Sequence, residues 1–201
     1  TRMAFVITDT QMDGGRLMRA VMAFSGGMDS TGLLVHLLAR GYKVSTLSYD
    51  YGQKHVIELE RAKANIEYLA TNGFDVEHRI VDLKSAMSIF HSALTNSEIE
   101  IPEGHYEEEQ MKATVVPNRN AIFASILYGY ALSISTKENI DVNIALGVHS
   151  GDHAIYPDCR PEFYDSIGES FALGNWDSER VSFNLPYIDG DKVTILRDAL
   201  I

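Results

Sequence analysis

The sequence predicts an α/β fold in which a parallel five-stranded sheet is flanked by helices. Short apolar runs, typical of buried parallel strands, alternate along the chain with longer segments of helical periodicity. Between residues 20 and 51 a strand, a helix and a second strand follow one another, which is the connection that builds parallel sheets. With 201 residues, of which 45% are hydrophobic, the chain can bury a substantial core. We expect a single domain over residues 20–201, preceded by an N-terminal extension over residues 1–19.

The first half of the chain contains three predicted strands and two predicted helices. Leucines recur at helical spacing in the first helix, and Gly41 is a natural residue to follow its end. Asn72 and Gly73 close the second helix. In chain order, these elements are a strand at 20–24, a helix at 30–40, a strand at 43–51, a helix at 56–71 and a strand at 76–83.

A long segment over residues 84–117 interrupts this alternation. It contains an apolar patch followed by a run of glutamates, and a loop of this length is usually a lid or a mobile segment. A solvated acidic excursion without a role explains the same residues equally well. The chain then returns to predicted elements, with a helix at 119–136, a strand at 142–147, a helix at 161–173 and a strand at 181–187.

The composition narrows the function classes. A net charge of −11 weighs against a general electrostatic attraction to nucleic acid, and so against an enzyme that acts directly on tRNA. Cys159 is the single cysteine, so no disulfide framework forms within the chain, as expected in a reducing cytosol. No apolar run approaches membrane-spanning length, and no signal peptide is evident at the start. We therefore expect a cytoplasmic protein with no nucleic-acid or membrane partner.

The segment after the first predicted strand has the features of an anion site. Its two adjacent glycines, Gly26 and Gly27, let peptide N–H groups approach a ligand, and the start of the following helix adds unsatisfied donors. The hydroxyls of Ser25, Ser30 and Thr31 can donate to phosphate oxygens. The segment lacks the lysine of a Walker-type loop and the third glycine of a dinucleotide fingerprint. We interpret it as a phosphate-binding loop rather than a simple turn.

Three further polar clusters follow strands or open a helix: residues 50–55, 117–120 and 149–160. In open α/β sheets the ligand crevice lies beyond the carboxyl ends of the strands, so these clusters define one site. Within the last cluster, His149, Asp152 and His153 are potential zinc ligands, although substrate binding explains them better. Its cysteine is either a nucleophile or, as is more common for a lone cysteine, a small buried hydrophobe.

Four motifs carry a resemblance to a known family. They are Ser25-Gly26-Gly27-Met28-Asp29-Ser30-Thr31, Tyr51-Gly52-Gln53-Lys54-His55, Val116-Pro117-Asn118-Arg119-Asn120 and Tyr156-Pro157-Asp158-Cys159-Arg160. The first resembles the pyrophosphate (PP) loop that is shared by all PP-loop adenylating ATPases. The four together, in this order and spacing, resemble the 7-cyano-7-deazaguanine synthases, and the likeness covers residues 20–201.

The resemblance implies a Rossmann-like fold of the adenine nucleotide alpha-hydrolase-like (HUP) class and an ATP-dependent ligase that forms C–N bonds. Such an enzyme converts 7-carboxy-7-deazaguanine and ammonia into 7-cyano-7-deazaguanine, by adenylating first the carboxylate and then the amide, in queuosine-type 7-deazapurine biosynthesis. The resemblance implies ATP and Mg²⁺ as cofactors and leaves a homodimer open. It also implies a zinc site of four cysteines that this sequence lacks, so the chain is either truncated or divergent. Its end at Ile201, inside an apolar-periodic segment, favours truncation.

The resemblance further assigns the site residues. ATP binding falls to Phe24, Ser25, Gly26, Gly27, Met28, Asp29, Ser30, Thr31, Gly32, Leu33 and Leu34, with Asp29 also holding Mg²⁺. The catalytic group is Ser25, Asp29, Gln53, His55 and Arg119, and His55 or His149 is the candidate acceptor of a proton from ammonia. The substrate-binding group is Asn120, Asp152, Tyr156, Asp158 and Arg160.

Two rival functions share the predicted loop. One is another PP-loop adenylating enzyme of the tRNA-modifying or amidotransferase type, which does not explain residues 156–160. The other is a nucleotide-binding homologue that has lost catalysis, for which the missing cysteines are the only indication. Calorimetry separates the second rival from an enzyme, because a sensor binds ATP without consuming it when substrate is supplied.

Overall fold

The computed structural model describes residues 17–53, 57–90, 115–153 and 156–200. In this part of the chain, a five-stranded sheet has the order β3-β2-β1-β4-β5, and all of its strand pairs are parallel. The strands are β1 (Arg19–Ala23), β2 (Lys43–Asp50), β3 (Glu77–Asp82), β4 (Val142–Ala145) and β5 (Val181–Asn184). The predicted parallel five-stranded sheet is confirmed.

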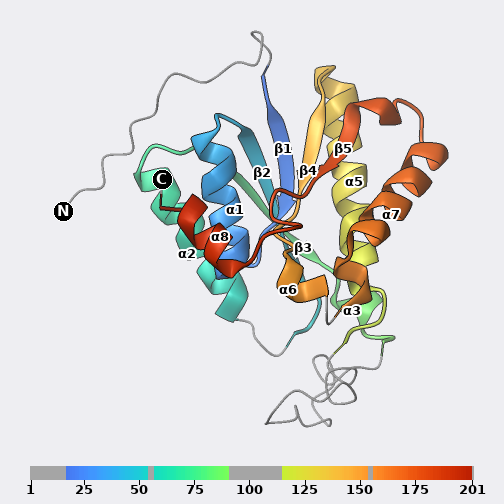
Figure 1. Ribbon diagram of the computed structural model, residues 1–201, viewed down its shortest axis with the longest axis horizontal. Coiled ribbons are helices and arrows are strands. Elements are labelled where there is room, and N and C mark those ends of the chain that lie inside the picture. Colours follow the sequence, from blue (N-terminus) through green and yellow to red (C-terminus); the bar gives the residue numbers. More distant parts are fainter. Residues whose placement is uncertain (1–16, 54–56, 91–114, 154–155, 201) are drawn as a thin grey trace.

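Helices cover both faces of this sheet, as Figure 1 shows. One face carries α1 (Met28–Ala39), α2 (Ile57–Thr71) and α8 (Lys192–Asp198), and the other carries α5 (Arg119–Glu138) and α7 (Pro161–Gly174). Short helical turns complete the described elements, namely α3 (Lys84–Met87), α6 (Ser150–His153), η1 (Pro157–Cys159) and η2 (Ser178–Arg180). None of the helices in the described part of the chain is long and apolar enough to cross a membrane.

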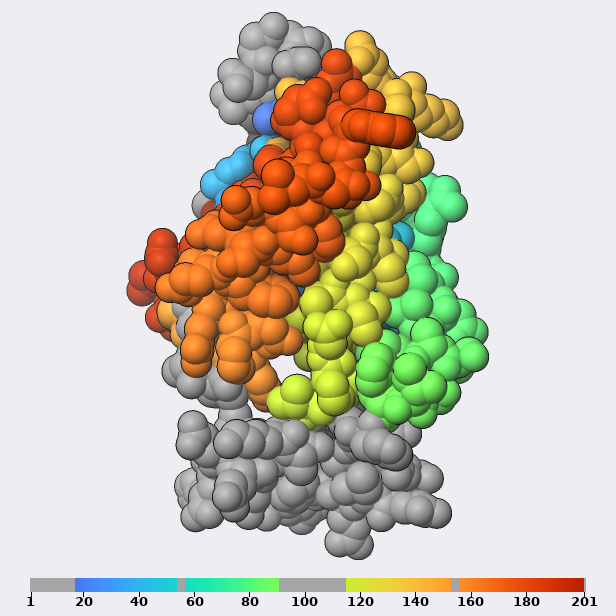
Figure 2. Space-filling view, turned by 90° about the vertical axis from the view of Figure 1, so that its right-hand side faces the viewer, coloured from blue at the N-terminus to red at the C-terminus, as the bar shows by residue number. Residues whose placement is uncertain are grey.

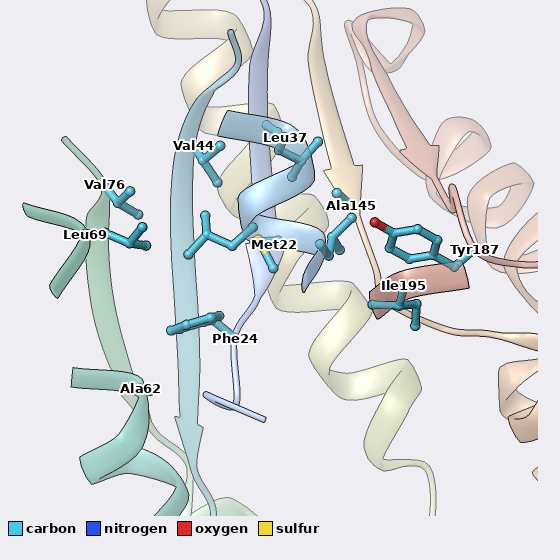
Figure 3. Close-up of a cluster of buried hydrophobic side chains, with 13 residues drawn as sticks. Met22, Phe24, Leu37, Val44, Ala62, Leu69, Val76, Ala145, Tyr187 and Ile195 are labelled. Carbon is cyan, nitrogen blue, oxygen red and sulfur yellow. The ribbon is translucent and has the colours of Figure 1, made fainter. Parts of the chain in front are cut away.

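Each face of the sheet buries its own hydrophobic cluster, because side chains alternate along β1. Met22 and Phe24 point to the face covered by α1, α2 and α8, where Figure 3 shows them among Leu37, Val44 and Ile195. The opposite cluster contains residues of α5 and β4. On that side α5 and α7 run next to each other (Figure 2), and the rings of Tyr128 and Phe171 lie 4.7 Å apart. The central strands β1 and β4 are therefore buried on both faces of the sheet.

The element boundaries differ from the prediction in physically clear ways. Arg19 pairs with strands on both sides of β1, so the sheet begins inside the expected N-terminal extension. The last strand ends at Asn184, before Pro186, which has no N–H to donate to a neighbouring strand. Gly41 follows α1 with φ +77°, as expected for a helix-ending glycine. The expected long loop begins with the short helix α3, and its residues 91–114 lie outside the described part.

The strand order places a topological switch point next to β1. The chain passes from β1 to β2 and β3 on one side, and later fills the other side with β4 and β5. Ligand crevices of open α/β sheets lie at such a point, beyond the carboxyl ends of the strands. The short helices α3 and α6, which follow β3 and β4, lie at this end of the sheet, the lower end in Figure 1.

Candidate active site

A cavity of about 410 Å³ opens at the carboxyl ends of β1, β2 and β4. Its position at the switch point agrees with the site that the polar clusters predict. Among its described lining residues, Arg119 is the only one with a positively charged side chain. The lining residues are Ala23, Phe24, Ser25, Asp29, Ser30, Ser48, Tyr49, Tyr51, Gln53, Glu58, Leu59, Arg119, Asn120, Phe123, Leu146, Gly147, Val148 and Tyr164.

The serine- and glycine-rich loop after β1 is held tightly against α2. Gly26 has φ +75°, and a Cβ there would lie 2.4 Å from the backbone nitrogen of Ala62. Ser25 Oγ accepts a hydrogen bond from the Gly27 N–H at 3.2 Å, and Ser30 Oγ donates to the Gly27 carbonyl at 3.2 Å. Gly27 precedes α1 without a capping side chain in the described part of the chain. The first N–H groups of α1 are therefore available to an anion.

Asn65 of α2 ties this loop in place. Its side-chain amide donates to the Gly26 carbonyl at 3.3 Å and to Thr31 Oγ1 at 3.2 Å. Sequence reasoning missed Asn65, which comes from another helix and belongs to none of the four motifs. The one available indication was an asparagine, a poor helix former, in the middle of a predicted helix.

The acidic side of the cavity contains Asp29, with His149 and Asp152 behind it. Asp29 Oδ1 is buried and has no hydrogen-bond partner in the part of the chain that the structure describes. His149 is buried, and its Nε2 lies 3.9 Å from Asp29 Oδ2 and 3.6 Å from Asp152 Oδ2. A carboxylate oxygen without a partner next to a phosphate loop is a suitable ligand for Mg²⁺, which usually takes one or two carboxylates together with phosphates.

An aromatic wall forms the α5 side of the cavity. The rings of Tyr49 and Phe123 stack at 3.9 Å with an interplanar angle of 11°, and Tyr49 donates its hydroxyl hydrogen to the Phe123 carbonyl at 3.0 Å. Tyr51 packs against Phe123 at 5.6 Å. The Arg119 guanidinium carbon lies 6.0 Å from the centre of the Tyr51 ring, and its Nη1 lies 3.5 Å from the Tyr51 hydroxyl. A planar ligand with an anionic group finds both a flat surface and a cation here.

Gln53 lines the cavity, but its amide group is already engaged by the backbone. Its Nε2 donates to the Tyr49 carbonyl at 3.0 Å, and its Oε1 accepts from the Tyr51 N–H at 2.9 Å. These bonds hold the turn after β2, which supports the aromatic wall. A direct contact between Gln53 and phosphate stays a prediction, and His55 lies outside the described residues.

Three residues of the predicted ATP-binding segment belong to the protein interior. Leu33 and Leu34 are fully buried in the core cluster beneath α1, and neither lines the cavity. Gly32 is buried under α8, where a Cβ would lie 2.5 Å from Ile195 Cγ2. Side chains beyond the first turn of α1 face the core, so these three residues contribute packing contacts. Their predicted role in ATP binding stays a prediction. Met28 is 41% exposed and does not line the cavity either.

The predicted substrate residues are brought together only in part. Asn120 lines the cavity, and its Nδ2 lies 3.7 Å from Cys159 Sγ. Tyr156, Asp158 and Arg160 flank or belong to η1 and do not line the cavity. Tyr164 of α7, which was not predicted, lines it instead. Burial raises the pKa of the Tyr164 hydroxyl, and the carboxylates of Asp158 and Asp152 add to this rise.

Cys159 behaves as a buried neutral thiol. It is 6% exposed, and burial, with the nearby Asp158 and Asp152 carboxylates, raises its pKa to about 12. Because the thiolate is the reactive form, we expect the native thiol to react with a disulfide reagent at pH 8 at least ~100-fold more slowly than the unfolded chain does. Stopped-flow thiol titration in buffer and in guanidinium checks this. Equal rates in the two solvents would restore Cys159 as a candidate nucleophile.

Comparison with solved structures defines the class of protein. The chain is similar to a structure titled as a predicted subunit of tRNA methyltransferase from Methanocaldococcus jannaschii, with a TM-score of 0.55 and 17% identity, covering 92% of this chain and 75% of the other. It is also similar to a 4-thiouridine synthetase in an RNA complex with bound ATP, with a TM-score of 0.51 and 17% identity, covering 91% of this chain and 40% of the other. The fold and these two likenesses define a Rossmann-like α/β protein.

The family is also shown. The chain belongs to the family described as queuosine biosynthesis protein QueC, whose model matches residues 19–200. It is 44% identical over 182 residues to a 7-cyano-7-deazaguanine synthase of Hahella chejuensis, covering 90% of this chain and 74% of the relative. It is 45% identical over 183 residues to one of Caldicellulosiruptor saccharolyticus, covering 91% of this chain and 76% of the relative. The family that the four motifs resemble is confirmed.

Proposed function

We propose that this chain converts 7-carboxy-7-deazaguanine and ammonia into 7-cyano-7-deazaguanine at the expense of ATP. The observation that carries the proposal is the match to the 7-cyano-7-deazaguanine synthases over nine-tenths of the chain. The cavity supports it, because a phosphate loop lies on one side and a flat aromatic wall with a cation on the other. We assign the nucleotide to the loop side of the cavity and the purine-like acid to the aromatic side.

The reaction needs ATP because a carboxylate is a poor electrophile, from which an oxide or hydroxide cannot leave easily. In the first step, a carboxylate oxygen attacks the α-phosphorus of ATP and pyrophosphate departs. Ammonia then displaces AMP, which carries that oxygen away, and an amide forms with loss of one proton. In the second step, the amide oxygen attacks the α-phosphorus of a second ATP, and pyrophosphate departs again. Loss of AMP and of two protons from nitrogen then leaves the nitrile. Each nitrile thus requires two ATP and releases two AMP and two pyrophosphates.

The loop after β1 has the right groups to hold the departing pyrophosphate. The hydroxyls of Ser25 and Ser30 lie 3.2 Å apart, and the uncapped start of α1 adds backbone donors. Preorganised donors of this kind stabilise charge that develops during the reaction without having to reorient. The Thr31 hydroxyl accepts a hydrogen bond from Asn65, which favours a role in holding the loop rather than in direct contact with phosphate.

Asp29 is the residue that would hold Mg²⁺, which when bound would neutralise charge on the phosphates. The support is its buried and unpartnered Oδ1 at the start of α1. Zinc is a different case, since the chain has one cysteine and therefore cannot supply the four ligands that the family suggests. Within the described residues, no group of three or more histidine, cysteine or acidic side chains is arranged to hold a metal ion. We therefore assign zinc no step.

The acid would lie against the aromatic wall, with its carboxylate toward Arg119. A ring that packs on Phe123 and Tyr51 gains apolar contact, and the guanidinium offsets the charge of the carboxylate before activation. Asn120, at the start of α5, would bind a polar edge of the ring, and its place in the cavity lining supports this role. The task of these residues is to position the acid near the α-phosphorus.

The experiment is to incubate the chain with ATP, Mg²⁺, an ammonium salt and 7-carboxy-7-deazaguanine, and to follow AMP, pyrophosphate and nitrile by mass spectrometry and ion chromatography. We expect two AMP per nitrile, with the amide as an intermediate, and no AMP when the acid is omitted. AMP formation only with another acid would favour a different PP-loop adenylating enzyme. ATP binding without consumption would favour a nucleotide-binding homologue that lacks catalysis.

A further inference from the structure

A buried histidine lies behind the carboxylate of the phosphate loop. His149 follows β4, and its side chain is 4% exposed and does not line the cavity. Its Nδ1 accepts a hydrogen bond from the Gly151 N–H at 3.1 Å. A ring nitrogen that accepts a hydrogen bond carries no proton, so the proton of this ring lies on Nε2. That Nε2 is buried and has no hydrogen-bond partner in the described part of the chain.

The Nε2–H group faces two carboxylates. Its nitrogen lies 3.6 Å from Asp152 Oδ2 and 3.9 Å from Asp29 Oδ2, just beyond the range of a hydrogen bond. A buried donor is rarely left unpaired in a native protein, and a small rotation of either carboxylate would pair this one. Asp152 also lies 3.4 Å, through Oδ2, from the backbone nitrogen of His149, which fixes it beside the ring.

Close backbone contacts hold this arrangement rigid. A Cβ at Gly151 would lie 2.9 Å from His149 Cε1, so the imidazole packs directly on the backbone of Gly151. A Cβ at Gly147 would lie 3.2 Å from the Asp29 carbonyl oxygen, so the segment after β4 touches the start of α1. Ser150 adds two hydrogen bonds to the Gly190 carbonyl, from its backbone nitrogen at 2.8 Å and its hydroxyl at 2.6 Å. The ring therefore has little freedom to swing away from Asp29.

We propose that His149 is a positioning residue for Asp29, whose carboxylate it orients at the start of α1 through the Nε2–H group. The inference rests on the proposed function, in which Asp29 holds Mg²⁺ beside the pyrophosphate. Replacement of a residue that orients a metal-binding side chain typically lowers metal affinity or activity by roughly 10- to 100-fold. We expect an effect of this size for His149. This assignment also gives Asp152 a structural partner in His149, and its predicted contact with substrate stays a prediction.

Two amide substitutions separate this role from a purely structural one. His149→Gln keeps a donor near the position of Nε2, whereas His149→Asn keeps an acceptor near Nδ1 for the Gly151 N–H and removes the donor. If His149 only supports the turn at Gly151, the asparagine variant is the better substitute. If His149 orients Asp29, the glutamine variant is the better substitute.

Calorimetry of ATP binding with and without MgCl₂ provides a readout that does not depend on turnover. For the wild-type chain we expect Mg²⁺ to strengthen ATP binding. His149→Asn is expected to reduce that gain by about 10- to 100-fold, and His149→Gln by less than about 3-fold. In an Asp29→Asn background, His149→Asn should have no further effect, because coupled residues are not additive. Equal Mg²⁺ dependence of wild type and His149→Asn would overturn the inference.

The tautomer of the wild-type ring is an independent check that requires no variant to fold. Nitrogen-15 NMR of histidine-labelled protein should show Nδ1 of His149 as the unprotonated nitrogen and Nε2 as the protonated one. A proton on Nδ1 would overturn the inference whatever the calorimetry gives. Failure of the wild-type chain to bind ATP would instead contradict the proposed function, while the NMR result would still decide the orientation of the ring.

Discussion

Gly26→Ala is expected to abolish ATP binding and to lower the free energy of unfolding by about 2–5 kcal/mol, the sum of the costs of a left-handed backbone conformation and of an overpacked contact. Gly26 has φ +75°, and a Cβ there would lie 2.4 Å from the nitrogen and 2.8 Å from the Cα of Ala62. These are backbone atoms of α2, which cannot rotate aside. The loop would have to move away from α2, and the contacts of Asn65 with Gly26 and Thr31 would be lost.

Gly73 provides the matched control for this substitution. It has a similar φ of +88°, but nothing lies within 4 Å of a Cβ built there, and it follows α2 at its far end. Gly73→Ala should therefore lower the free energy of unfolding by only about 1–2 kcal/mol, for the backbone conformation alone, and leave ATP binding unchanged. Urea unfolding and calorimetry compare the two variants. Wild-type ATP affinity in Gly26→Ala would show that the loop does not need its close contact with α2.

Local pattern predicts the central strands β1 and β4 well, because a strand that is covered on both faces is a short apolar run. Strand ends are less certain, and Tyr187 shows why. An apolar residue at this position is buried whether the strand continues or the chain turns. In the structure the chain leaves β5 after Asn184, and Tyr187 packs beside α8 with its hydroxyl donating to Asp198 at 2.7 Å. Figure 3 shows this side chain inside the core.

The candidate site is predictable where its groups belong to one short motif. Ser25 and Asp29 were predicted because a strand is followed there by glycines, hydroxyls and a carboxylate, and Arg119 because a polar cluster opens the long helix α5. Phe123 and Tyr164 were not found, since an aromatic residue inside an apolar helix has the same pattern whether it lines a cavity or fills the core. Leu33 and Leu34, which follow the motif in the predicted ATP-binding segment, lie in the apolar stripe of α1 and pack in the core.

Asp29→Asn is expected to reduce acid-dependent pyrophosphate release by about 10²–10³-fold or more, the usual effect of removing one preorganised charge-stabilising group. The substitution keeps the shape of the side chain but removes its negative charge, and Mg²⁺ binding requires that charge. Asp29 is 35% exposed, and its Oδ1 has no hydrogen-bond partner in the described part of the chain, so no bond through that oxygen is lost. We therefore expect the free energy of unfolding to fall by no more than about 1 kcal/mol, the usual effect of losing one negative charge in the first turn of a helix.

A large fall in activity with at most a small fall in stability separates a role in the reaction from a role in folding. Ser25→Ala should also abolish acid-dependent pyrophosphate release, because it removes a phosphate donor and the acceptor of the Gly27 N–H. Asp165→Asn, an exposed carboxylate on α7, is the control and should keep wild-type turnover. Pyrophosphate release by a coupled assay and unfolding in urea are measured on the same preparations. Among the described elements, only the loop after β1 and the start of α1 offer uncapped helix donors, hydroxyls and a carboxylate together to this cavity. Unchanged turnover in both Asp29→Asn and Ser25→Ala would therefore remove this loop from the mechanism.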